Sequence, residues 1–257
     1  MASLQQIFWG AAVLLVCCLA VLMLLRQLHR IYFFFFLFLV FEVVRSLVLF
    51  PISPKSGLYY WIFVVSQPIS WLLYVFVVLE IYSLAFKEHP GIASLSRWVL
   101  SAALLAAIGI SALTLGADLS KPALSFKLLV LYSVIERGVV SSLLLFLLLI
   151  TAFLVFFPLP VRRNLAIHTT IFSAYFLSTA LALFTRNVAG YQTSRIISTV
   201  LLGIDIICFT LWIFLLKQAG ETIVQPIRRR WHPDDEARML QQLDAISSVL
   251  LRHSGND

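Results

Sequence analysis

The residues in this sequence that could do chemistry are a few ionisable or polar side chains within or beside long apolar segments. A charged group in the middle of a membrane costs on the order of 2.5–3.5 kcal/mol on insertion scales, so each one needs either a partner or a function. Those that stand out are Glu42, Arg45, Gln67, Glu80, Glu136, Arg137, Arg186, Arg195 and Asp205. We therefore take these side chains as the candidate site residues.

The pattern of these residues excludes most kinds of catalysis and cofactor binding. Zinc hydrolases and intramembrane proteases need clustered His and carboxylates, paired Asp residues or a nucleophile motif, and the sequence contains none of these. A retinal protein needs a lysine in the middle of its last span, where this sequence has Asp205. Haem needs paired histidines, but only His168 lies well within an apolar run. We expect no enzyme activity, no metal and no cofactor.

The elements that must position the candidate residues are membrane-spanning helices. Of the 257 residues, 61% are hydrophobic and 12% are charged, whereas an average soluble domain is roughly 45–50% apolar and about 25% charged. Apolar runs bounded by charge, Pro or Gly are long enough to cross a bilayer core of ~30 Å. They cover residues 7–25, 31–50, 58–86, 97–116, 128–157, 164–186 and 193–217. The sequence therefore predicts an all-α, polytopic bundle of seven transmembrane helices.

Lys and Arg near the ends of these runs predict the orientation. Ten of them lie on one side of the membrane and five on the other. Because cytoplasmic loops carry the excess of Lys and Arg, we expect the N-terminus outside and the C-terminus in the cytoplasm, in the inner (plasma) membrane. The net charge of +7 divides into +8 over the transmembrane domain, 1–217, and −1 over the tail, 218–257. The basic excess thus reflects orientation, and we expect no nucleic-acid binding.

With this orientation, the candidate residues fall into two groups by depth. The outer half of the membrane holds four arginines and one acid, namely Arg45, Glu136, Arg137, Arg186 and Arg195. The middle and inner half holds only acids, namely Glu42, Glu80 and Asp205. One interpretation is an outward-facing pocket for an anionic or polar ligand, with Gln67 in its wall and the buried carboxylates as a switch. The other is a set of satisfied bridges that fix the bundle, such as Glu42 with Arg45 on one helix face.

The tail, 218–257, is expected to hold a cytoplasmic helix. Met239, Leu243, Ile246 and Leu250 recur at spacings of 4, 3 and 4, which predicts one apolar stripe. An amphipathic helix from Asp234 to Arg252 would then lie on the inner leaflet of the lipid bilayer, anchored by the basic run at 228–230. Docking to a cytoplasmic protein partner is the alternative. The small residues of the run 97–116 favour close helix packing within the bundle or in a homodimer.

One stretch resembles a known group of proteins. The segment Leu79-Glu80-Ile81-Tyr82 through Phe86-Lys87-Glu88-His89-Pro90-Gly91 is similar to that of uncharacterised bacterial seven-helix membrane proteins. The layout of the membrane part also resembles the seven-helix sensor region that precedes some bacterial histidine kinases, although this sequence has no kinase domain. The resemblance covers the membrane part only and implies, by analogy, a sensory role in signal transduction.

From these observations we expect a non-catalytic sensor or receptor-like membrane module that signals through a cytoplasmic partner. A small seven-helix solute transporter is an alternative, in which the intramembrane acids couple transport to protons. A structural membrane scaffold is a second alternative, in which the same acids contribute only to stability.

Overall fold

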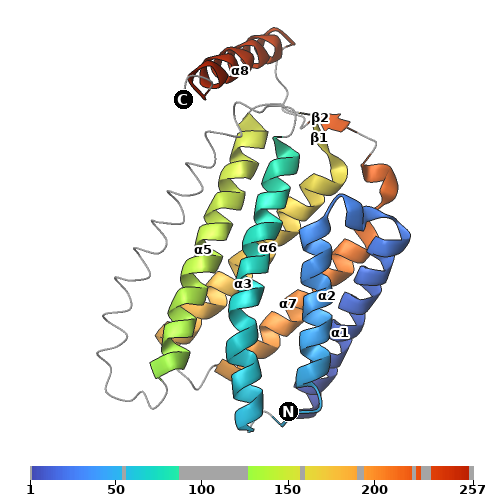
Figure 1. Ribbon diagram of the computed structural model, residues 1–257, viewed down its shortest axis with the longest axis vertical. Coiled ribbons are helices and arrows are strands. Elements are labelled where there is room, and N and C mark those ends of the chain that lie inside the picture. The colour runs from blue at the N-terminus through green and yellow to red at the C-terminus, as the bar shows by residue number, and fades with distance from the viewer. Residues whose placement is uncertain are drawn as a thin grey trace. The chain divides into compact units, whose positions relative to one another are not determined.

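The computed structural model describes residues 2–53, 56–86, 127–156, 160–189, 194–221, 224–226 and 233–254 (Figure 1). The α-helices among them are α1 (Ala2–Leu25), α2 (Phe33–Leu49), α3 (Gly57–Ala85), α5 (Lys127–Phe156), α6 (Arg163–Ala189), α7 (Ser194–Leu215) and α8 (Pro233–Ser254). Two short 3-10 turns, η1 (Leu28–Arg30) and η3 (Gln218–Gly220), and two strands, β1 (Pro160–Arg162) and β2 (Val224–Pro226), accompany these helices.

Five helical segments in the described part of the chain are long and apolar enough to cross a membrane. They are Gln5–Leu25, Gly57–Ala85, Ile135–Ala152, Arg163–Thr185 and Ile196–Leu215. Helix α2 has 17 residues, at the lower end of the ~17–25 that a transmembrane helix needs. Runs of this kind fold as helices because every backbone N–H and C=O in the hydrocarbon core must be bonded within the protein. A helical membrane bundle is thus confirmed, while the predicted run 97–116 lies outside the described residues.

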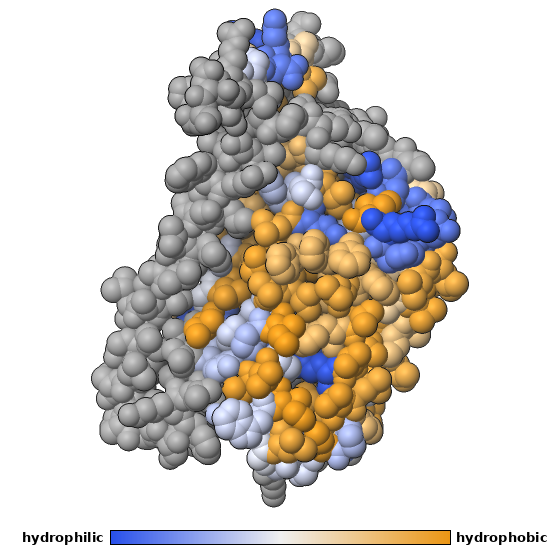
Figure 2. Space-filling view, in the orientation of Figure 1, coloured by the Kyte–Doolittle hydropathy of each residue, from blue (hydrophilic) through white to orange (hydrophobic). Residues whose placement is uncertain are grey.

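The helices present large apolar side chains on their surface, as lipid contact requires. Leu14 on α1, Leu47 on α2 and Phe214 on α7 are each more than half exposed. Figure 2 shows a broad hydrophobic area on one face, over α2 and α3. In a soluble protein such an area would be an association site, whereas in a membrane protein it is the surface that lipid covers.

The contacts divide the chain into two units. The first comprises Met1–Glu80 and Thr170–Gln218, and so contains α1, α2, α7 and most of α3 and α6. The second comprises Ile81–Thr169 and Ala219–Asp257, and so contains α5, α8 and both strands.

The core of the first unit is aromatic. Helix α1 packs against α2 and α7. Phe35 of α2, Phe172 of α6 and Trp212 of α7 form a closed triangle, with ring centroids separated by 5.5 Å, 5.0 Å and 4.7 Å. All three side chains are buried. Because aromatic side chains bury large apolar areas in preferred relative orientations, this triangle holds α2, α6 and α7 at fixed positions.

The end of α7 is capped by a side chain from another helix. Arg26 follows α1 directly and donates from Nη1 to the carbonyl oxygens of Ile213, at 3.4 Å, and Leu216. The last carbonyl groups of a helix have no partner within it, and they form the negative end of the helix dipole. Arg26 therefore satisfies both the hydrogen-bonding and the charge requirement of this helix end.

The second unit contains a small polar junction that the sequence did not predict. Strands β1 and β2 pair antiparallel, with Val161 opposite Gln225. Glu221 accepts hydrogen bonds from Arg162 at 3.3 Å and from the buried Asn164 at 2.7 Å. Gly220 lies so close to Asn164 that a Cβ atom at this position would overlap the asparagine side chain. Glycine is therefore required here by close approach.

The predicted tail helix is confirmed as α8, over Pro233–Ser254. Leu243 is buried, while Ile246, on the same predicted stripe, remains half exposed. The stripe is thus only partly covered by the rest of the described chain.

Candidate ligand-binding site

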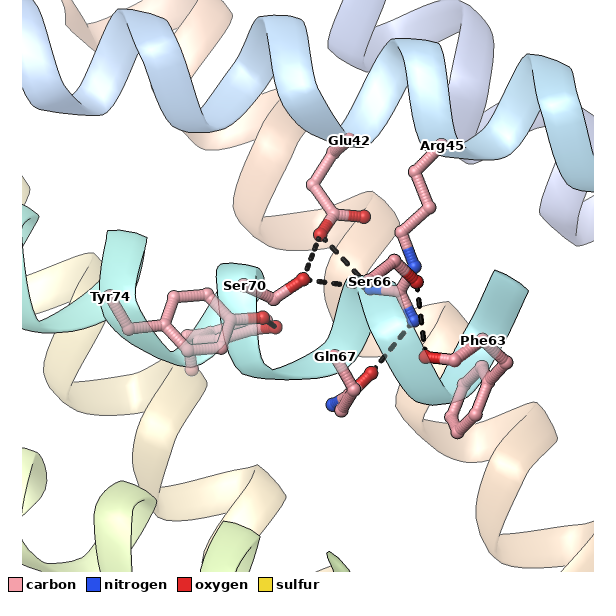
Figure 3. A network of polar contacts seen from close by, with 8 residues as sticks. Glu42, Arg45, Phe63, Ser66, Gln67, Ser70 and Tyr74 are labelled. Carbon is pink, nitrogen blue, oxygen red and sulfur yellow. Dashed lines mark hydrogen bonds and ion pairs between the residues drawn. The ribbon is translucent and has the colours of Figure 1, made fainter. Parts of the chain in front are cut away.

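A polar network joins α2 to α3 within the first unit (Figure 3). Arg45 forms an ion pair with Glu42 one turn earlier on α2, with 3.3 Å between Nη1 and Oε1. It also donates from Nη1 to the Ser70 hydroxyl at 2.9 Å and from Nη2 to the Gln67 side-chain oxygen at 2.8 Å. Ser70 in turn donates to Glu42 at 3.2 Å. These four residues are referred to below as the Arg45 network.

The Arg45 network has a buried side and an accessible side. The residues on α3 are covered, since Ser70 is 1% and Gln67 8% exposed. The charged residues on α2 are not fully covered, since the side chains of Arg45 and Glu42 are 13% and 22% exposed. Figure 2 shows a small hydrophilic area between α2 and α3, surrounded by hydrophobic surface. The charged groups are therefore held by buried partners while part of their surface stays open.

An aromatic ring fixes the position of the Arg45 side chain. Its guanidinium carbon lies 5.3 Å from the centre of the Phe63 ring on α3, a favourable cation–π distance. The hydroxyl of Ser66 bonds within its own helix, α3, where it donates to the carbonyl oxygen of Phe63 at 3.1 Å. Helix α3 continues through Pro68, so the network residues keep their helical spacing.

A pair of tyrosines extends the polar region beyond the Arg45 network. The hydroxyls of Tyr74 on α3 and Tyr175 on α6 are 2.8 Å apart and share a hydrogen bond. Tyr74 lies one turn after Ser70 on the same helix, which places the tyrosine pair next to the Arg45 network. In the part of the chain that the structure describes, no ion pair joins Asp205 to an arginine. Helices α2, α3 and α6 thus contribute polar side chains to this region.

Glu80 performs a different task from the other acids. Its two carboxylate oxygens accept hydrogen bonds from the backbone N–H groups of Phe34, at 3.0 Å, and Phe35, at 3.2 Å. These N–H groups belong to the first turn of α2, whose own N-cap, Tyr32, makes no side-chain cap. A carboxylate there satisfies free donors and interacts favourably with the positive end of the helix dipole. Glu80 is therefore a cap supplied by a neighbouring helix.

The structure brings together only some of the predicted site residues. Arg45 contacts both Glu42 and Gln67, whereas Asp205 makes no hydrogen bond or ion pair within the described residues. Glu136 and Arg137 lie on α5 in the second unit, where both are partly buried and have interaction partners. The side chains of Arg186 and Arg195 lie outside the described residues. Of the four arginines that were predicted to form an outer cluster, Arg45 is therefore the one that lies in the network.

Several residues of the site were missing from the prediction, although one signal was present. Gln67, Ser70 and Tyr74 are spaced by three and four residues, which places them on one face of α3. That spacing extends the polar face from Gln67 to the tyrosine pair. Phe63 and Tyr175 carry no such signal, because an aromatic residue in an apolar run looks like any other core residue.

Comparison with known proteins identified no relative of this chain. No protein-family model matches the chain, and no curated protein or solved structure is significantly similar to it. What the site does must therefore be argued from its own geometry. The site consists of a guanidinium, an adjacent carboxylate, and the hydroxyl and amide groups that are hydrogen-bonded to them.

Proposed function

We propose that this chain is a non-catalytic integral membrane protein of the sensor or receptor type, in which the Arg45 network binds a small polar ligand. The observation that carries the proposal is that Arg45 and Glu42 are held rigidly by buried partners yet remain partly exposed. Ionisable residues in transmembrane helices are rare, and they commonly mark ligand or ion sites. Rigid support of an accessible charge is the arrangement that a binding site needs.

The proposal includes seven spans, with the N-terminus outside and the C-terminus in the cytoplasm of the inner (plasma) membrane. The distribution of ten basic residues on one side against five on the other supports this topology. A tag at the C-terminus should then be inaccessible from outside intact cells. Labelling of such a tag by an impermeant reagent would contradict the topology.

We further propose that α8 reports the state of the bundle to a cytoplasmic protein. Its half-exposed Ile246 beside the buried Leu243 supports an amphipathic helix that can still take part in another contact. The resemblance to bacterial sensor regions supports the same role by analogy. The chain would thus act in signal transduction through its partner rather than through an enzyme of its own.

The binding role is tested by a thermal-shift screen of small polar compounds on the purified protein. A compound that binds the network should raise the melting temperature of the native protein clearly more than that of Arg45→Gln. The Arg162→Gln variant is the matched control, because it removes an arginine from an ion pair of the same 3.3 Å length in the second unit. Equal stabilisation of native protein and Arg45→Gln by every active compound would contradict the proposal.

Transport of a solute is the second candidate, and the polar groups that several helices contribute to this region favour it. The hydroxyls of Tyr74 on α3 and Tyr175 on α6 share a hydrogen bond, and Tyr74 lies one turn after Ser70, so polar groups from three helices lie in the region of the Arg45 network. Transporter sites are commonly built from such groups on several helices. This candidate predicts flux of the bound compound into proteoliposomes and loss of that flux in Asp205→Asn. Binding without flux would favour the sensor.

A further inference from the structure

We infer that the Arg45 network recognises a zwitterionic group in which a primary ammonium and an anion are joined by a short linker. This inference rests on the proposed function, because it names the ligand class of the same site. It follows from the hydrogen-bonding groups of Arg45 and Glu42 that the network does not use, and from the way opposite charges are placed side by side.

Arg45 retains donors for an anion. A guanidinium has five N–H groups, and the contacts within the described residues use two on Nη1 and one on Nη2. The Nε–H and one Nη2–H remain. Guanidinium N–H groups bind carboxylate and phosphate oxygens strongly, and often two at a time. The anionic part of the ligand is therefore expected on this side of Arg45.

Glu42 retains an acceptor for an ammonium. Its Oε1 atom accepts from Arg45 and from Ser70, whereas Oε2 has no hydrogen-bond partner among the described residues. A primary ammonium can donate to this oxygen, but a trimethylammonium has no N–H to donate. The site is therefore expected to distinguish a primary ammonium from a quaternary one.

The close pairing of the two charges disfavours ligands of one sign. An anion alone on Arg45 would lie near the Glu42 carboxylate, whose Oε1 is 3.3 Å from Arg45 Nη1. A cation alone on Glu42 would lie near Arg45. Both repulsions strengthen where water is scarce, as between two apolar helices. A ligand with both charges meets an opposite charge at each end.

The surroundings hold these groups in place before any ligand arrives. Gln67 and Ser70 are buried and bonded to the guanidinium, and the Phe63 ring lies against it. Little side-chain entropy is then lost when a ligand binds. Preorganised opposite charges three residues apart on α2 require the two charges of the ligand to be close together as well.

Two sources carry this chemistry, an ethanolamine phospholipid headgroup and a free amino acid or aminoalkyl phosphate. The first test uses the purified full-length chain in nanodiscs of dioleoyl phosphatidylcholine, alone or mixed equally with dioleoyl phosphatidylethanolamine, and counts retained lipids by native mass spectrometry. The second measures thermal shifts in detergent with glycine and with 2-aminoethyl phosphate. Acetate and ethylamine are the single-charge controls.

The lipid source predicts at least tenfold preference for the ethanolamine lipid over the choline lipid. The free source predicts stabilisation by glycine or 2-aminoethyl phosphate and none by acetate or ethylamine. In either case Glu42→Gln and Arg45→Gln should weaken the affinity about tenfold, which is the loss expected for one hydrogen bond to a charged group, and so reduce the lipid preference or the thermal shift. Arg162→Gln should leave both unchanged. Glu42→Asp keeps the negative charge, so it should bind better than Glu42→Gln. This comparison separates a loss of binding from a loss of folding.

Two other outcomes are distinguishable. If acetate or another single-charge compound stabilises the protein through Arg45 as strongly as the zwitterions do, the ligand class is wrong and the proposed binding role stands. If neither the lipids nor the zwitterions distinguish native protein from the network variants, the inference fails. The proposed binding role fails as well only if no compound of the polar screen distinguishes them.

Discussion

Arg45 on α2 donates a hydrogen bond of 2.8 Å from Nη2 to the side-chain oxygen of Gln67, which lies on α3 22 residues further along the chain. This bond joins two apolar helices, and the buried amide of one helix supplies a hydrogen-bond partner for the charged group of the other. It also sets the plane of the guanidinium, because Ser70 and Phe63 contact the same group from α3. Support of the helix pair and presentation of a charge are therefore properties of one network.

Replacement of Gln67 by leucine should destabilise the protein by about 0.5–2 kcal/mol, the range of interhelical hydrogen bonds in membranes. The cause is an Arg45 N–H group that loses its buried partner. Thermal unfolding in one fixed detergent measures the change. Combining Gln67→Leu with Arg45→Gln should cost less than the sum of the single changes, because both remove the same bond. Full additivity would show that the bond contributes nothing.

Loss of the Glu80 carboxylate should loosen the first turn of α2. Glu80→Gln removes the charge that meets the helix dipole, and Glu80→Ala also removes the acceptors for Phe34 and Phe35, at a cost of about 0.5–2 kcal/mol. Hydrogen exchange of the Phe34 and Phe35 amides should become faster. The amide of Leu39, one turn or more into the helix, is the internal control. Unchanged exchange at Phe34 and Phe35 would contradict the capping role.

The two tyrosine hydroxyls should behave as one unit. Tyr74→Phe and Tyr175→Phe remove the same 2.8 Å hydrogen bond, so the double variant should be little less stable than either single variant. Thermal unfolding of the three variants measures this. Tyr59→Phe is the control, because no hydrogen bond of the Tyr59 hydroxyl occurs in the described part of the chain. Additive losses in the double variant would exclude the pairing.

In the second unit, Gly220→Ala should be destabilising because the new Cβ overlaps the side chain of Asn164. Overpacking of this kind typically costs about 1–3 kcal/mol. Asn164→Ala makes room but removes the bond to Glu221. The double variant should therefore be less destabilised than the sum of the two single changes. A Gly220→Ala variant as stable as the native protein would contradict the close approach.

Much of the helical architecture could be predicted from hydropathy, because a bilayer permits few ways to satisfy the backbone. The pairing of Glu42 with Arg45 could also be predicted, since residues three apart share one helix face. The role of Glu80 could not, because its partners are backbone groups 45 and 46 residues away. The short strands β1 and β2 were missed for a related reason: three residues carry too little alternation to be recognised.

The distinction between a site and a bridge follows from the same residues. A buried ion pair often contributes little net stability, because desolvation offsets the attraction between its charges. A network that only bridged α2 and α3 should therefore tolerate neutral replacement of both charges with no further consequence. If the network is a binding site, the same neutral replacement should leave the stability of the protein nearly unchanged but abolish ligand binding.

The most direct measurement is the thermal shift caused by the zwitterionic ligand in the double variant Glu42→Gln, Arg45→Gln, compared with the native protein. We predict that the melting temperature without ligand stays within a few degrees of the native value, because both charges are removed together and neither is left buried without its partner. The ligand-induced shift should disappear. A double variant that keeps the full shift would contradict the assignment of the Arg45 network as the binding site.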